Sequence, residues 1–171
     1  MLVNLNQTLT LAATQEEAWR LLRDTKRLAG LIPGVESIAS EYGEFGGANG
    51  ETSQEKHVAD VVERVGPFRL NLRLAVRIVK AVEPSLLEAQ LNGADAKGQN
   101  RLSGTLRAEL KQIEPSETLL SVDASVEVMG KLAALGAAPI RRRAIELFEQ
   151  FTRRLQGEFS AAGAAGEGSA A

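Results

Sequence analysis

The sequence predicts an α+β domain in which one antiparallel sheet is covered by a long C-terminal helix. Roughly ninety residues, between 35 and 130, alternate between apolar and polar side chains, and this period of two is typical of strands. From residue 132 onward the apolar side chains recur at steps of three and four, as they do on one face of a helix. The 171 residues fit a single domain.

The N-terminal segment predicts one strand followed by two short helices. Residues 4–13 alternate in the manner of a strand. Thr14 and Glu17 have the spacing of a capping box, in which each side chain binds the backbone N–H of the other residue. We therefore expect a helix over 15–23, and a second helical turn over 25–30.

The strand with the clearest alternation is "FRLNLRLAVRIVKAV", residues 68–82. Its leucines face one way, and its arginines at positions 69, 73 and 77 face the other way. Alternation this regular indicates a sheet with one covered face and one face in water. Glycine and proline separate further segments of this kind, so we expect a curved antiparallel sheet of about six to seven strands.

The C-terminal helix is expected to run from about 132 to 156, with a possible kink at Pro139. The domain would then comprise residues 1–156. Residues 157–171 are rich in alanine and glycine and offer little to bury, so a flexible tail is the expectation there.

The amino-acid composition excludes several kinds of functional site. The chain has no cysteine, which excludes disulfides, thiolate zinc sites and cysteine nucleophiles. His57 is the only histidine, so a metal site made of histidines is excluded, and no cofactor is predicted. A net charge of −2 gives little attraction to nucleic acid. No apolar run reaches the length of a membrane span, and we expect a cytoplasmic protein with at most peripheral contact with the inner membrane face.

Four stretches together carry a family resemblance: "EEAWRLLRD" (16–24), "IPGVESI" (32–38), "RVGPFRLNLR" (64–73) and "VMGKLAALG" (128–136). They resemble the START-like helix-grip superfamily, also called SRPBCC, which includes polyketide cyclases. The similarity is greatest to the carbon monoxide dehydrogenase G-subunit family, over roughly residues 4 to 156.

The resemblance implies a helix-grip fold, in which a curved sheet wraps around the long helix and leaves an internal cavity. It also implies a non-enzymatic accessory protein that couples or recruits a molybdenum hydroxylase of the carbon monoxide dehydrogenase type to the membrane. A lipophilic small molecule, such as a quinone, is the guest expected in an apolar slot. Two alternatives stay open: an enzyme of the cyclase/dehydratase kind acting on a polyketide-like substrate, and an interaction module without a ligand.

In such a fold the segment after the two short helices runs along the rim of the cavity. Leu31, Ile32 and Val35 would then line the entrance, and Pro33 with Gly34 would fix the turn that aims them there. The alternative is a plain helix-to-strand corner packed on the core. The expected walls of the cavity are aliphatic residues of the sheet and of the long helix, namely Leu70, Leu72, Leu74, Leu106, Val122, Val126, Leu135 and Ile140.

His57 and Glu63 share strand parity with apolar residues, at positions where the family resemblance implies apolar inward side chains. They are candidate polar anchors for a ligand, since binding pockets combine apolar walls with a few placed polar groups. The alternative is that both lie in water or in satisfied hydrogen bonds.

The sequence gives weaker indications of catalysis and of docking to a partner or a membrane. No residue is predicted to be catalytic, because no serine lies in a nucleophile-elbow sequence to accompany His57. Arg141, Arg142 and Arg143 are consistent either with a solvated helix face or with a docking patch for an acidic partner or a membrane surface.

Overall fold

The fold is a single seven-stranded antiparallel sheet with three α-helices. The computed structural model describes the backbone of residues 1–46 and 52–170, and the side chains of residues 1–44 and 55–160. The elements are β1 (Leu2–Leu11), α1 (Gln15–Arg23), α2 (Thr25–Leu31), β2 (Val35–Gly46), β3 (Thr52–Val65), β4 (Phe68–Val82), β5 (Leu86–Ala94), β6 (Asn100–Glu114), β7 (Glu117–Gly130), the 3₁₀-helix η1 (Lys131–Leu135) and α3 (Ala137–Ala170). This confirms the predicted α+β helix-grip class and the two short helices after the first strand.

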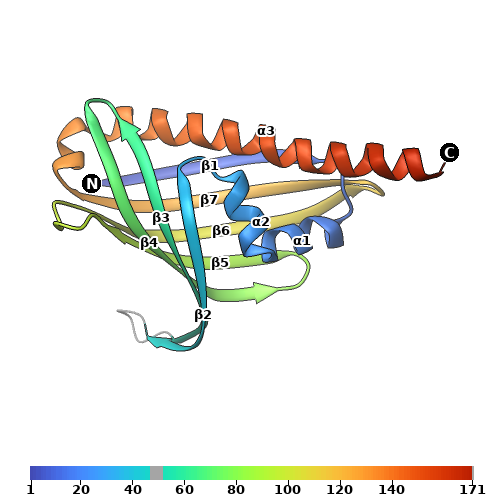
Figure 1. The fold of residues 1–171 in the computed structure, drawn as a ribbon, viewed down its shortest axis with the longest axis horizontal. Coiled ribbons are helices and arrows are strands. Elements are labelled where there is room, and N and C mark those ends of the chain that lie inside the picture. The colour runs from blue at the N-terminus through green and yellow to red at the C-terminus, as the bar shows by residue number, and fades with distance from the viewer. Residues whose placement is uncertain (47–51, 171) are drawn as a thin grey trace.

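The strands follow the order β1-β7-β6-β5-β4-β3-β2, so β1 and β2 form the two edges of the sheet. Figure 1 shows α3 running along β1 at one edge, while α1 contacts β6 and β7, and α2 contacts β2 at the other edge. The register places the leucines of β4 on the face that carries the helices. We call this the inner face, and the opposite, polar face the outer face.

The capping box predicted at the start of α1 is present. The Glu17 N–H donates to Thr14 Oγ1 at 3.2 Å, and the Thr14 N–H donates to Glu17 Oε2 at 3.4 Å. The apolar side of α1 buries Trp19, which is 6% exposed, against the inner face. Trp19 therefore holds the first helix on the sheet.

The C-terminal helix differs from the prediction at both ends. Residues 131–135 form a separate 3₁₀-helix, and Gly136 ends it with a φ of 83°, a left-handed conformation that favours glycine. The α-helix starts at Ala137, so Pro139 lies in its first turn, where a missing N–H costs no intrahelical hydrogen bond. Pro139 therefore does not interrupt the hydrogen bonds of α3, and a kink at this residue stays a prediction.

At the other end, α3 continues through residue 156 to Ala170. Phe159 is 8% exposed and belongs to the hydrophobic core, so the expectation that nothing beyond residue 156 is buried is wrong at this position. Flexibility of the remaining tail, to residue 171, stays a prediction.

The core consists of two clusters. One, which we call the α1 cluster, joins α1, β1, β5, β6, β7 and α3, and its members include Leu11, Trp19, Leu120 and Leu155. The other, the η1 cluster, lies where the β3–β4 turn meets β1, β7 and η1, and its buried members are Val3, Val65, Leu70, Val128 and Leu132. Buried side chains therefore cover the inner face at two places rather than along its whole length.

The α1 cluster yields a test of the core. Leu120 is 1% exposed at its centre, and its replacement by alanine is expected to lower the free energy of unfolding by about 2–5 kcal/mol, because a cavity replaces buried methyl groups. Leu2→Ala is the matched control: Leu2 lies on neighbouring β1 but is 55% exposed, so its effect is expected within about 0.5 kcal/mol. Urea unfolding followed by circular dichroism measures both. Equal midpoints for the two variants would contradict the assignment of the core.

Candidate functional site

The middle of the inner face is apolar but incompletely covered. Ala59, opposite Leu74, is buried there, but five larger inward side chains belong to neither cluster and are only partly buried; they are Val61, Leu74, Val76, Leu91 and Leu102. We call these residues the middle strip. The register places them side by side on β3, β4, β5 and β6, because Leu74 pairs with Gly93, and Gly93 pairs with Leu102.

Gly93 determines how closely two leucines of the middle strip approach each other. A Cβ atom at this position would lie 3.2 Å from Leu102 Cγ and 3.3 Å from Leu74 Cδ1. These distances are tighter than ordinary van der Waals contact, so a larger residue would push against both leucines. The glycine thus allows the two leucines to approach each other across the middle strip.

The predicted cavity walls are divided between the two clusters. Leu31, Leu106 and Val122 pack against the α1 cluster. Leu70 belongs to the η1 cluster, and four further residues pack against it: Leu72, Val126, Leu135 and Ile140. Leu74 lies between them in the middle strip. All of these strand residues are on the predicted face, whereas their role as walls of one slot stays a prediction.

The segment after α2 turns sharply and is tied to β3. Gly34 has a φ of 86°, and a Cβ atom at this position would lie only 2.6 Å from the Val62 carbonyl oxygen, so the turn requires glycine. The Val62 N–H donates to the Gly34 carbonyl at 2.8 Å. Ile32 is 39% exposed, and Val35 begins β2 opposite Val61. An entrance lined by Leu31, Ile32 and Val35 remains a prediction, but the turn predicted for Gly34 is present.

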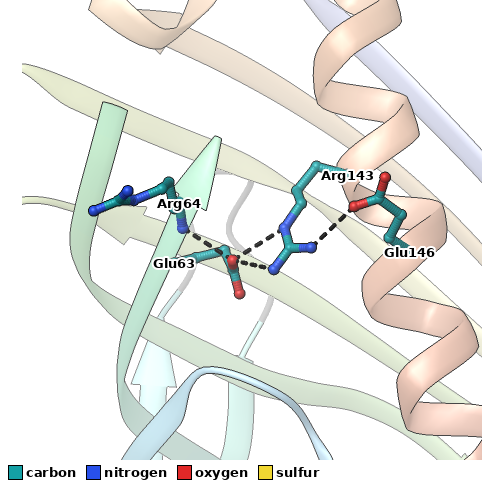
Figure 2. Close-up of polar contacts among 4 residues, drawn as sticks. All are labelled: Glu63, Arg64, Arg143 and Glu146. Atoms are coloured by element: carbon teal, nitrogen blue, oxygen red, sulfur yellow. Dashed lines mark hydrogen bonds and ion pairs between the residues drawn. The ribbon is translucent and has the colours of Figure 1, made fainter. Parts of the chain in front are cut away.

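Glu63 connects β3 to α3 (Figure 2). Its Oε1 accepts hydrogen bonds from Arg143 Nε at 3.0 Å and Arg143 Nη2 at 2.5 Å, and from the Arg64 N–H at 2.9 Å. Arg143 Nη1 also donates to Glu146 Oε2 at 2.9 Å. The hydrogen bond to Glu63, followed by that to Glu146, raises the pKa of the Arg143 guanidinium above its usual value, although burial opposes this. The contact therefore attaches α3 to β3, near the edge of the sheet opposite β1.

This geometry divides the three arginines into two groups. Arg143 is directed at the sheet and paired within the molecule, whereas Arg141 and Arg142 are exposed. The cationic surface that α3 presents to solvent at this point therefore consists of Arg141 and Arg142.

His57 lies in a second polar network on β3. It is 5% exposed, and its Nδ1 lies 2.8 Å from Ser40 Oγ on β2. Its Nε2 lies 3.3 Å from Glu55 Oε1 and 3.5 Å from Thr25 Oγ1. Arg23 of α1 in turn pairs with Glu55 Oε2 at 2.9 Å. Both ring nitrogens therefore have polar neighbours.

His57 and Glu63 lie on the inner face in hydrogen bonds, and the sequence identified none of their partners, so their role as ligand anchors stays a prediction. Ser40, Glu55 and Arg23 come from three elements, and only the register of β2 on β3 brings Ser40 opposite His57. The one signal available in the sequence is that Glu55 and His57, two residues apart on a strand, must share a face.

The outer face carries a different surface. An open hollow of about 1380 Å³ crosses β3, β4, β5 and β6, and three arginines, Arg69, Arg73 and Arg101, line it together with asparagine and serine side chains. Val61 and Leu102 of the middle strip also border this hollow, so its lining is mixed rather than purely polar. Within the described part of the chain, no group of three metal-ligating side chains could hold an ion, and no helix is long and apolar enough to cross a membrane.

The family model for the G subunit of carbon monoxide dehydrogenase (CoxG) matches residues 8–160. The chain belongs to the CoxG family. This match spans both polar networks and, apart from Val3, the buried residues of both core clusters, and it confirms the resemblance carried by the four sequence stretches. The chain has no match among curated proteins.

Solved structures share the fold. A conserved protein from Geobacillus kaustophilus superimposes with a TM-score of 0.78 at 24% identity, over 94% of this chain and 97% of that one. A START superfamily protein from Mycobacterium smegmatis gives 0.67 at 17% identity, over 93% and 98%. The Zhui aromatase/cyclase from Streptomyces sp. R1128 gives 0.62 at 13% identity, over 94% of both chains. These likenesses establish the START-like architecture.

The clamp between β3 and α3 is testable by mutation. Arg143→Met leaves the Glu63 carboxylate, 15% exposed, without its cation, and is expected to lower the free energy of unfolding by about 1–3 kcal/mol. Arg142→Met removes an exposed arginine one position earlier on the same helix, so a change within about 0.5 kcal/mol is expected. Denaturant titrations of both variants make the comparison. If Arg143→Met matched Arg142→Met, the ion pair would contribute nothing to the attachment of α3.

Proposed function

We propose that this family member binds a lipophilic molecule, a quinone being the best candidate, between α3 and the inner face of the sheet. The proposal includes the role implied for the family, that of an accessory protein coupling a molybdenum hydroxylase of the carbon monoxide dehydrogenase type to the membrane. The observation that carries the proposal is the middle strip, an apolar surface left partly exposed between two well-packed clusters.

The energetics favour an apolar guest. Removing apolar surface from water contributes about 25 cal/mol per Å². A micromolar affinity corresponds to about −8 kcal/mol, so it requires roughly 300 Å² of net apolar burial before the costs of immobilisation are met. A planar ring with a short isoprenoid chain provides a surface of this order. No catalytic group is needed for such binding.

The polar networks support the same assignment. Glu63 is neutralised by Arg143, and His57 has neighbours at both ring nitrogens, so neither leaves an uncompensated charge on the inner face. A guest lying on the middle strip would therefore meet an apolar surface bordered by satisfied polar groups.

Fluorescence titration with a short-chain naphthoquinone and with a fatty acid tests the ligand. Leu74→Trp and Leu106→Trp are expected to abolish saturable binding, because the larger side chains fill space over the strip and next to it on the inner face of β6. Leu2→Trp is the matched control, since Leu2 points outward and is 55% exposed, and it should bind as the parent does. Circular dichroism checks that each variant is folded. Absence of binding by the parent to any lipophile would favour the ligand-free interaction module instead.

The docking role predicts a second measurement. Arg141 and Arg142 are exposed at the start of α3. Each cation near an anionic membrane contributes about 1 kcal/mol, so the Arg141→Gln/Arg142→Gln double variant should bind phosphatidylglycerol vesicles roughly 30-fold more weakly than the parent. Arg153→Gln/Arg154→Gln, which removes two exposed arginines further along the same helix, is the control. Equal sedimentation of both double variants with vesicles would show that the first pair has no special part in docking.

A further inference from the structure

We propose that Ser40 is an activated nucleophile that accepts acyl groups from carboxylic esters, with His57 as its general base. This activity is separate from ligand binding on the middle strip. The observation behind it is the continuous chain Ser40–His57–Glu55, in which a hydroxyl, an imidazole and a carboxylate follow one another across two neighbouring strands.

The two distances along this chain match the proposed roles of its members. Ser40 Oγ lies 2.8 Å from His57 Nδ1, within hydrogen-bond reach of a base. On the other side of the ring, Nε2 lies 3.3 Å from Glu55 Oε1. A carboxylate accepts hydrogen bonds but cannot donate them, so its position assigns the ring proton to Nε2 and leaves the Nδ1 lone pair facing Ser40. Such arrangements are recognised by geometry and roles, not by sequence order.

The serine hydroxyl and the imidazole differ in their exposure to solvent. His57 is 5% exposed, whereas Ser40 is on β2 at the edge of the sheet and is exposed. The base is thus shielded while its serine can be reached from solvent. In addition, β2 has a neighbouring strand on one side only, so alternate N–H groups along it have no strand partner and can donate to a developing oxyanion.

The site borders two kinds of surface. Tyr42, Glu55 and Arg23 line an open hollow of about 450 Å³ on one side of Ser40. On the other side the inner face continues to Ile38 and its partner Ala59. An ester with an apolar acyl chain fits this division, with the chain toward Ile38 and the leaving alcohol toward the hollow.

The reaction balances without a cofactor. His57 Nδ1 takes the Ser40 proton as Oγ forms a bond to the ester carbonyl carbon, and the carbonyl π electrons move to oxygen. The resulting intermediate collapses, the ester C–O bond breaks, and the leaving alkoxide takes the proton back from Nδ1. Water then repeats both steps and releases the carboxylic acid. Glu55 is a positioning residue that stabilises the transient imidazolium.

Labelling of the full-length protein with a fluorophosphonate probe tests the nucleophile. Mass spectrometry should locate the adduct on Ser40, and Ser40→Ala should abolish it. Ser37→Ala is the matched control, because Ser37 is on the same strand and hydrogen-bonds Asp60 at 2.8 Å but has no histidine beside it. An adduct distributed over both serines, or none on Ser40, would overturn the proposal.

The base and its positioning residue have their own readouts. His57→Gln should slow labelling, and release of p-nitrophenol from p-nitrophenyl butyrate, at least tenfold. Glu55 of β3 lies beside His57 Nε2, and Arg23 of α1 pairs with Glu55. Glu55→Gln should slow both reactions, since the transient imidazolium loses its carboxylate, and Glu55→Asp should restore part of the rate. Full activity in folded His57→Gln, or equal rates in Glu55→Gln and the parent, would overturn the assigned roles.

Discussion

The position of α3 along one edge of the sheet is the constraint on which the rest of the structure depends. Seven strands present a broad apolar face, and the helix packs chiefly along β1. A single helix about 10 Å across cannot cover so many strands, which lie about 4.8 Å apart. Other elements must therefore cover the remainder, or it must stay accessible.

The two core clusters include the elements that cover the parts of the inner face beyond α3. α1 carries Trp19 onto the strands at one end, and η1 carries Leu132 onto the β3–β4 turn region at the other. Each cluster is tightly packed, and the middle strip between them is not. Incomplete coverage of this kind costs stability, because apolar area that remains in contact with water contributes nothing to the hydrophobic effect. A ligand that recovers this area is the physical rationale for the proposed binding function.

Local sequence rules were sufficient for most of the elements. The capping box located α1, alternation located the strands, and the change of period located the C-terminal helix. The exact start of α3 could not be predicted, because the apolar steps continue through η1 and only the left-handed conformation at Gly136 separates the two helices. Burial of Phe159 was missed because the segment that contains it is rich in alanine and glycine, although the side chain itself reaches the core.

The site was less predictable than the fold because its contacts join distant segments. Strand parity put His57 and Glu63 on the inner face, but Arg143 is 80 residues from Glu63 in the sequence. Ser40 was missed because a nucleophile was sought in an elbow sequence, whereas here the pairing of β2 with β3 brings the hydroxyl to the imidazole. Such pairings depend on register, which short motifs do not encode.

The two networks on β3 show how a strand carries ionisable groups on an apolar face. An unpaired carboxylate or imidazolium there would pay a desolvation cost of several kcal/mol. Each is matched from another element instead: Arg143 of α3 reaches Glu63, while Ser40 of β2 and Thr25 of α2 approach the His57 ring. Because these partners belong to the edge strand and to helices that lie over the sheet, moving any of them would expose a buried charge or an unsatisfied polar group. The networks therefore tie the positions of α2, α3 and β2 to β3, and they fix the borders of the apolar strip that lies between them.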